Sequence, residues 1–352
     1  MKAYITAASA ISPQHSFQED AYLLETVLPE HGHFTAIEPV YRDYIDPKLS
    51  RRMSRVIKMS VTCAQQCLKS VGIAEPEAII VGTGLGCLQD TEKFLLELLE
   101  NQEGLLSPTA FIQSTHNTIA GQIALTLNCS AHNFTYVQRA HSFEKALEDG
   151  LLHVQEGKAQ VLLGGVDEIT PTLYEILAQA GCTGKSENPS LNFPNRWGEG
   201  ASFFLLSAGP SENSLACIEG TASFYHPSIT EEELVARVQE FLENHHLSFN
   251  TIDAVMLGMQ SDMEVNALYH HLYDTAFSGK LLLQFKNLCG EYFTASAFAH
   301  QLAARVLQKQ QVFKSIKLKG EAGSKLDNIL FYNHYQGKYH TFSLLSRCQP
   351  SR

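Results

Sequence analysis

One stretch of the chain combines three hydrophobic patterns in direct succession. Residues Asn133–Val137 predict a short strand, and a turn follows at residues 138–141. Apolar residues then recur at i, i+3 and i+4, which predicts one buried face of a helix: Phe143, Ala146, Leu147, Leu151 and Val154. We expect Ser142 to cap the first turn of this helix and Gly157 to end it. The apolar run Val161–Leu163 predicts a central strand that is buried on both faces.

The same patterns predict the other elements of the first half. We expect strands at Ala3–Ile11 and Ala78–Val81 and helices from Arg51 to about Ser70, from Thr91 to Asn101 and from Thr172 to Ala180. Residues 14–50 predict a helix and an irregular connection, and Gly181–Asn195, rich in Gly, Ser, Asn and Pro, predicts a long loop.

The second half, from about Gly209, has the pattern of a repeat of the first. It predicts strands at Ala216–Gly220, Ala254–Leu257, Asn328–Phe331 and Phe342–Leu345, and helices at Thr230–Asn244 and Val265–Leu272. We therefore divide the chain into halves at 1–209 and 210–352.

The turn at residues 138–141 is a natural place for chemistry. In a strand–turn–helix unit the turn lies at the helix N-terminus, where unpaired N–H groups and the helix dipole favour an anion. Enzymes often place a nucleophile there, because a thiolate is stabilised. Here the turn reads Gln138-Arg139-Ala140-His141, so it offers no Cys, and no Ser before Ser142.

A second glycine-rich turn, at residues 82–86, follows the strand Ala78–Val81. The spacing GxGxG after a strand is one part of a dinucleotide fingerprint, which needs a third glycine three residues later. Gln89 occupies that position. The sequence therefore argues against a nucleotide site.

Several segments together resemble the β-ketoacyl synthase family. They are the strand Leu163–Asp167, the GEGA segment Gly198–Ala201 and the run from Lys286 to Ala297, where the family has a Lys, a Gly-His pair and small residues. The resemblance implies an α/β fold, the thiolase-like five-layered αβαβα fold made of two duplicated halves. It also implies a glycine-rich turn at residues 82–86, and dimers formed by pairing the strand Asn133–Val137.

In that family a Cys in the first turn and two His residues carry the reaction. Counting back from Gly157 places Ala140 at the nucleophile position, whereas counting forward along the strand places Gln138 there, as in many chain-length factors. The loop that supplies the first His reads Gly258–Glu264 here and has no His. Glu291 occupies the second His position, and the motif lysine is retained as Lys286. Because an ionised carboxylate cannot donate a hydrogen bond, we predict a structural ion pair between the two.

The resemblance predicts which residues line the site or a substrate tunnel: Phe111, Asn117, Gln138, Arg139, Ala140, His141, Lys286, Glu291, His334 and Gly337. Gly337 lies where the family has a flexible gate. For His334 and His340, a hairpin loop or a buried polar contact is favoured over catalysis.

Three functions are consistent with these positions. The first is a non-catalytic subunit, similar to a chain-length factor, that pairs with an active ketosynthase and shapes the acyl tunnel in polyketide or fatty acid biosynthesis; an acyl carrier protein would visit the complex. The second is an active β-ketoacyl synthase or another acyl-thioester transferase that uses other residues, for which the thiols to test are Cys87, Cys182 and Cys289. The third is a homodimeric protein that binds acyl thioesters.

Composition narrows the classes of partner. The formal charge of −11 argues against nucleic acid and a basic membrane-binding face, since phosphates attract an excess of Lys and Arg. The apolar runs are too short to span a membrane, and the N-terminus resembles a strand rather than a signal peptide. The eight cysteines show no paired metal spacing, so we expect reduced core residues of a cytosolic protein, with Cys63 and Cys67 buried together. We predict no cofactor and no metal.

Overall fold

The chain folds around a single mixed sheet. A computed structural model describes residues 2–17, 26–28, 33–104, 107–180, 182, 197–260 and 263–348. The strands of the first half are β1 (Ala3–Ile11), β2 (Ala78–Gly82), β3 (His132–Tyr136), β4 (Val161–Asp167) and β5 (Gly200–Ser207). Those of the second half are β6 (Ala216–Tyr225), β7 (Ala254–Leu257), β8 (Leu281–Gln284), β9 (Lys317–Lys319), β10 (Asn328–Tyr335) and β11 (Tyr339–Ser346).

Strand order is repeated between the halves. The 11-stranded sheet runs β3-β2-β4-β5-β1-β6-β11-β10-β7-β8-β9. Strand β2 is parallel to β3 and β4, and β5 is antiparallel to β4 and β1. The same directions recur for β7 with β8 and β10, and for β11 with β10 and β6. This repetition is what a duplicated unit produces, although the boundary at residues 209 and 210 stays a prediction.

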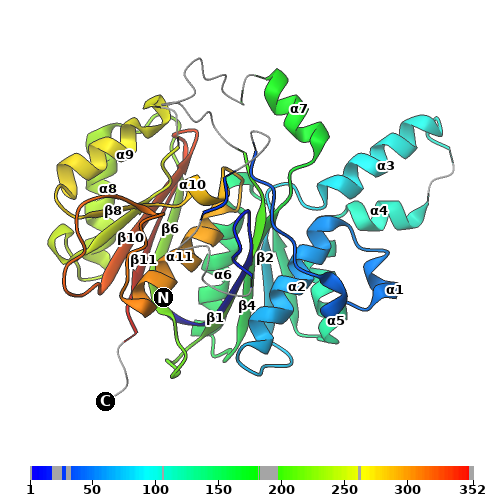
Figure 1. Ribbon diagram of the computed structural model, residues 1–352, viewed down its shortest axis with the longest axis horizontal. Coiled ribbons are helices and arrows are strands. Elements are labelled where there is room, and N and C mark those ends of the chain that lie inside the picture. Colours follow the sequence, from blue (N-terminus) through cyan, green and yellow to red (C-terminus); the bar gives the residue numbers. More distant parts are fainter. Residues whose placement is uncertain are drawn as a thin grey trace.

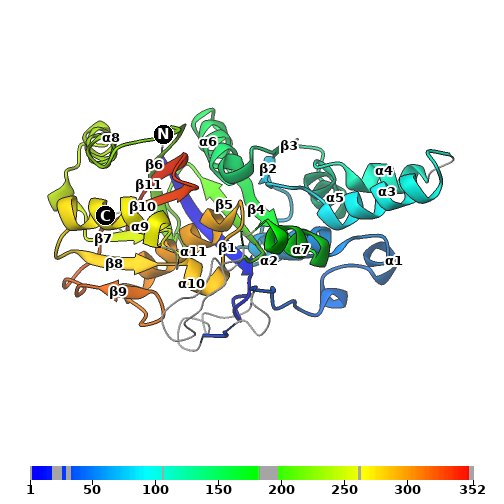
Figure 2. The same ribbon diagram turned by 90° about the horizontal axis from the view of Figure 1, so that it is seen from above.

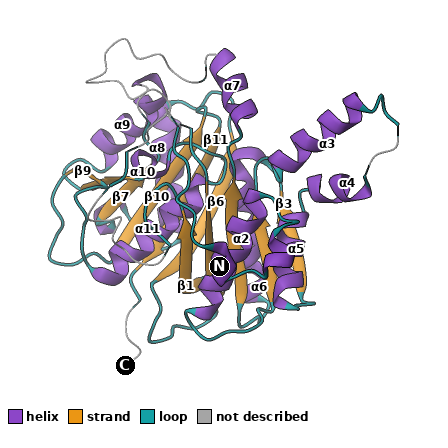
Figure 3. Ribbon diagram, turned by 45° about the vertical axis from the view of Figure 1, so that its right-hand side comes forward, coloured by secondary structure: helices purple, strands orange, loops and turns teal. Residues whose placement is uncertain are grey.

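Helices form three layers around the sheet. Helices α2 (Arg55–Lys69) and α5 (Thr118–Leu127) cover the outer face of the first half, and α8 (Glu231–Asn244) and α9 (Met263–Ala276) cover that of the second half. Between the halves, α6 (Ser142–Gln155) and α11 (Ala295–Lys309) share one hydrophobic core with both (Figures 1 and 3). The result is the predicted five-layered αβαβα architecture, with apolar surface buried at every interface between layers.

The remaining helices lie outside these layers or in loops. They are α1 (Pro47–Ser50), α3 (Leu88–Glu100), α4 (Pro108–Ser114), α7 (Pro171–Gln179), α10 (Lys286–Cys289) and the 3₁₀ turns Tyr41–Asp43, Arg139–His141 and Phe249–Thr251. Helices α3 and α4 project from the body of the molecule on the side of α5 (Figure 2).

Several predicted details were wrong or incomplete. Ser142 is the first residue of α6 and caps no helix; its hydroxyl accepts from the N–H of Gln138 at 2.8 Å and donates to the carbonyl of Arg139 at 2.7 Å, which closes the preceding 3₁₀ turn. Helix α3 begins at Leu88, three residues before the prediction. The predicted loop Gly181–Asn195 lies outside the described residues except for Cys182.

Cysteine usage agrees with the sequence. All eight cysteines are free, and Cys63 and Cys67 are both buried. Among the described residues, no helix combines the length and apolar character that spanning a membrane needs.

Candidate functional site

Most of the predicted site residues gather where parallel strands end. The turn at residues 138–141 follows β3, Lys286 follows β8 and His334 lies near the end of β10. The loop after β7 carries Gln260 toward the same place, since its side chain reaches Glu291. Crevices at the carboxyl ends of parallel strands are the usual location of α/β sites.

The turn itself is strained and half-exposed. Gln138 and Arg139 are exposed, whereas Ala140 and His141 are buried. Arg139 has φ +49°, a left-handed conformation that is uncommon for a side-chain-bearing residue and typical of functional turns. The His141 ring lies edge-on to Tyr339 of β11, with ring centroids 5.2 Å apart, so the turn packs against the β10–β11 hairpin.

A buried ion pair occupies the neighbouring position. Lys286 Nζ lies 2.7 Å from Glu291 Oε2, and both side chains are buried, which confirms the predicted pair. Gln260 Nε2 donates to the same carboxylate oxygen. Burial raises the pKa of Glu291, although the Lys286 charge and both hydrogen bonds act in the opposite direction. Both hydrogen bonds to this carboxylate come from donors, and an ionised carboxylate only accepts.

Tyr335 interacts electrostatically both with Arg139 of the turn and with Glu291 of this pair. Burial is the main cause that raises its pKa to about 12; the charge of Glu291 adds to the shift and that of Arg139 opposes it. Its ring centroid is 5.3 Å from that of Phe293. The structure therefore brings Arg139, Tyr335 and Glu291 into one electrostatic neighbourhood.

The hairpin histidines make buried polar contacts. His334 Nδ1 accepts from the N–H of Gly337 at 3.1 Å, and His340 Nε2 lies 3.1 Å from the carbonyl oxygen of Gly337. Burial lowers the pKa of His334 well below its ordinary value and that of His340 to about 4. Both imidazoles are neutral at pH 7, and Gly337 has φ +61° in the hairpin turn. The interpretation as a buried polar contact is confirmed.

Asp167 accepts hydrogen bonds from the glycine-rich turn at residues 82–86. Its carboxylate accepts from the Gly84 N–H at 2.8 Å, from the Leu85 N–H at 3.3 Å and from the Thr83 hydroxyl at 3.1 Å. It also accepts from the N–H and hydroxyl of Thr294, where α11 begins. Because a nucleotide phosphate would need these N–H groups, their bonds to Asp167 disfavour a nucleotide site.

The GEGA segment allows a close backbone contact and also places a buried carboxylate. A Cβ on Gly198 would lie 1.9 Å from the carbonyl oxygen of Cys289, so only glycine allows this close approach. Sequence reasoning missed Glu199, which is fully buried and accepts both guanidinium ends of Arg55 and the N–H of Ile169. The residue pair ties α2 to the sheet.

Two predicted lining residues lie elsewhere on this chain. Phe111 on α4 and Asn117 at the start of α5 are exposed, on the side of the sheet that ends in β3. Asn117 Oδ1 accepts from the hydroxyl of Thr135 on β3 at 2.9 Å. Their role in a tunnel stays a prediction.

The three candidate thiols differ sharply in exposure. Cys87 and Cys289 are buried, and burial raises the pKa of both thiols far above the ordinary value. Cys182 is exposed, and its carbonyl accepts from Trp197 Nε1 at 3.2 Å. Because the thiolate is the nucleophile, Cys182 is the most reactive of the three.

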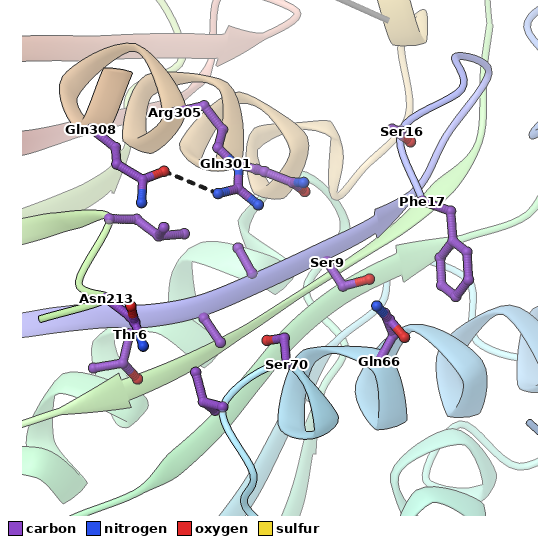
Figure 4. Close-up of a pocket in the computed structure, with 14 residues that line it drawn as sticks. Thr6, Ser9, Ser16, Phe17, Gln66, Ser70, Asn213, Gln301, Arg305 and Gln308 are labelled. Atoms are coloured by element: carbon purple, nitrogen blue, oxygen red, sulfur yellow. Dashed lines mark hydrogen bonds between the residues drawn. The ribbon is translucent and has the colours of Figure 1, made fainter. Parts of the chain in front are cut away.

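A cavity of about 320 Å³ lies apart from this site, between β1, α2 and α11 (Figure 4). Its polar lining includes Ser9, Gln66 and Arg305, and it contains none of the predicted site residues.

The comparisons with known proteins agree with this geometry. Residues 29–193 match the family model "Beta-ketoacyl synthase, N-terminal domain". A search of curated proteins found no match. A β-ketoacyl synthase from Burkholderia phymatum STM815 shares the fold at 16% identity with a TM-score of 0.80, covering 99% of this chain and 100% of that one.

Two ketosynthase complexes are also similar. The ishigamide ketosynthase/chain length factor matches at 14% identity and a TM-score of 0.78, over 99% of each chain. The ketosynthase ApeO in complex with its chain length factor ApeC, from Xenorhabdus doucetiae, matches at 15% identity and a TM-score of 0.75, over 98% of each chain. These identities show the fold. Residues 29–193 are therefore similar to the N-terminal domain of β-ketoacyl synthases, and the whole chain has the thiolase fold of the solved ketosynthases.

Proposed function

We propose that this chain is a ketosynthase-like subunit without the Cys-His-His triad, which pairs with an active β-ketoacyl synthase and shapes the tunnel for its acyl chain. The observation that carries the proposal is the chemistry of the turn at residues 138–141, which contains no thiol. Without a thiolate there is no acyl-enzyme, so the family's covalent reaction cannot start on this chain.

The second reactive region supports the same proposal. In active members, as the family resemblance implies, two His residues donate hydrogen bonds to the thioester oxygen. Here Glu291 is an acceptor that already holds Lys286 and Gln260. Its negative charge would repel a developing oxyanion, which catalysis must stabilise.

The surface around β3 suits a partner chain. Strand β3 is the last strand of the sheet on its side, so its outer edge is open for hydrogen bonding to a second chain. Large apolar side chains are exposed on β3 and on the helices beside it: Phe134, Phe111, Ile112 and Leu125. Exposed apolar groups of this kind mark interaction surfaces. With a partner seated there, Phe111 and Asn117 would face a shared tunnel.

The solved relatives support the choice of partners. Two of them are complexes of a ketosynthase with a chain length factor, and a third pairs a ketosynthase bound to the hexaketide with a type II PKS acyl-carrier protein. By analogy, an acyl carrier protein would visit the pair formed by this chain, in polyketide or fatty acid biosynthesis.

Mass spectrometry tests the absence of an acyl-enzyme. The purified chain is incubated with acyl carrier protein thioesters or with cerulenin, beside a ketosynthase that contains the cysteine. We expect no thioester adduct on this chain and a full adduct on the ketosynthase. An acyl adduct that disappears in Cys182→Ser would instead establish the alternative, an acyl-thioester transferase that uses another residue.

Co-purification tests the pairing. We expect the chain to co-purify with a co-expressed, cysteine-containing ketosynthase from the same organism. Phe134→Asp should abolish the complex because it places a charge on the exposed face of β3. The matched control is Leu318→Asp on β9, an exposed apolar residue at the opposite edge of the sheet, which should leave the complex intact. The heterodimer is refuted if the chain forms a stable homodimer and does not bind the ketosynthase.

A further inference from the structure

Three side chains that can bind a metal converge beside the start of β3. His132 is the first residue of β3, and Asp149 and His153 lie four residues apart on one face of α6. One ligand atom from each of the three lies within 4.8 Å of the other two. His153 Nε2 is 3.8 Å from Asp149 Oδ1, and the two imidazole centroids are 4.5 Å apart.

Each ligand on the helix lies beside a polar side chain. His153 Nδ1 is buried and, within the described part of the chain, has no hydrogen-bond partner; Glu156 Oε2 lies 3.4 Å from it. When Nε2 of a His binds a metal, Nδ1–H is usually directed at a carboxylate in this way. Asp149 interacts electrostatically with the hydroxyl of Tyr136. Glu156 and Tyr136 are therefore placed to orient the two ligands on α6.

From this geometry we propose that His132, Asp149 and His153 form a binding site for a divalent transition metal, with Zn²⁺ as the preferred ion. Two imidazoles and one carboxylate are a common zinc ligand set with a fourth position left for water. Bond lengths of 2.0–2.1 Å place tetrahedral ligands about 3.4 Å apart. The three ligand atoms lie within 4.8 Å of one another, so side-chain rotations that shorten these distances by about 1 Å close the site.

The site is separate from the chemistry of the turn at residues 138–141. It joins the edge strand β3 to α6, two elements that contribute its ligands from opposite ends of a strand–turn–helix unit. Bound zinc would cross-link them and stabilise the folded chain, because a ligand that binds only the native state raises its stability. The inference does not depend on the proposed function.

Zinc titration of the full chain, with any affinity tag removed and after treatment with EDTA, tests the site. Calorimetry should show one Zn²⁺ bound per chain and a rise in Tm on zinc addition. His132→Gln and His153→Gln should each weaken binding more than about tenfold, and Glu156→Gln about tenfold, since outer carboxylates typically contribute that much. Co²⁺ in place of Zn²⁺ should give a visible absorption band that the same variants lose.

A matched control separates this site from adventitious binding. His246 is an exposed histidine in the other half of the chain, and His246→Gln should leave zinc affinity unchanged. Circular dichroism confirms that each variant is folded. The proposal is overturned if the wild-type chain shows no saturable binding at millimolar zinc, or if the double variant His132→Gln/His153→Gln binds as tightly as the wild type.

Discussion

Removing Lys286 tests whether the pair at the candidate site is structural. Lys286→Met leaves the Glu291 carboxylate buried without its nearest positive charge. Breaking a buried pair on one side typically costs about 3–5 kcal/mol, because the remaining charge is uncompensated. The loss has a ceiling, since a carboxylate in that position takes up a proton instead of staying ionised.

The maximum loss of stability in Lys286→Met depends on the pH. Glu291 in the unfolded chain titrates near 4.5, and each unit by which its folded pKa rises costs about 1.4 kcal/mol. At pH 7 the gap of 2.5 units limits the loss to about 3.4 kcal/mol, and at pH 5 to about 0.7 kcal/mol. A carboxyl with a raised folded pKa is most stable below its unfolded pKa and loses stability as the pH rises. The variant should therefore be weakest at high pH.

Urea unfolding at pH 5 and pH 7 measures this difference. The single tryptophan, Trp197, is a suitable fluorescent probe because its backbone bridges to Glu291. The double variant Lys286→Met/Glu291→Gln removes both charges and should recover most of the stability. The reasoning is refuted if Lys286→Met is as stable as the wild type at pH 7, or if its loss is the same at both pH values.

Three shorter predictions follow from single contacts. Gly198→Ala should destabilise the chain by several kcal/mol or prevent folding, because its Cβ would lie 1.9 Å from the Cys289 carbonyl oxygen. Gly121→Ala in α5, which has open space around it, should instead stabilise the chain by about 0.5–1 kcal/mol. Thermal melts of the two variants test both expectations. Burial lowers the pKa of His340 to about 4, so the folded chain should lose stability as the pH falls from about 6.5 to 4, because this His is protonated first in the unfolded chain. His340→Asn should remove that part of the pH dependence of the urea midpoint. Iodoacetamide should label the exposed Cys182 long before Cys289, and equal rates on a peptide map would contradict the burial.

Sequence patterns predicted the elements that have one buried face. Helix α8 was predicted to within a residue, because Leu234, Val238 and Leu242 are buried while the opposite face is solvated. Helix α11 was missed because it lies between the two halves of the sheet. It is buried almost all round, including Ser296, His300 and Gln301, so no polar face marks it as a helix.

Helix α3 shows the opposite limit of the pattern. Its apolar stripe is clear in the sequence, yet none of its residues is buried, and Leu95, Leu96 and Leu99 are exposed. An amphipathic pattern predicts that one face of a helix is apolar, but it does not predict what packs against that face. The pattern therefore predicts the helix correctly and leaves the partner of its apolar face undetermined.

Motif spacing also predicted part of the site. The motif alignment places Lys286 and Glu291 five positions apart, and their opposite charges were enough to predict the ion pair. The contribution of Gln260 could not be found this way, since it comes from the loop after β7 and 31 residues separate it from Glu291. The cluster of His132, Asp149 and His153 was missed for a similar reason, because the packing of β3 against α6 brings its members together.

The scaffold is held by residues that do not take part in thioester chemistry. Asp167 joins the end of β4 to the glycine-rich turn and to α11, and Glu199 joins β5 to α2. Neither carboxylate depends on the residues of the turn at 138–141 or on Glu291. Because the supporting hydrogen bonds are separate from the reactive positions, those positions can change while the backbone around them is kept. Under the proposed function, the chain would in this way keep the ketosynthase-like fold, and a surface for its partner, with other groups at the reactive positions.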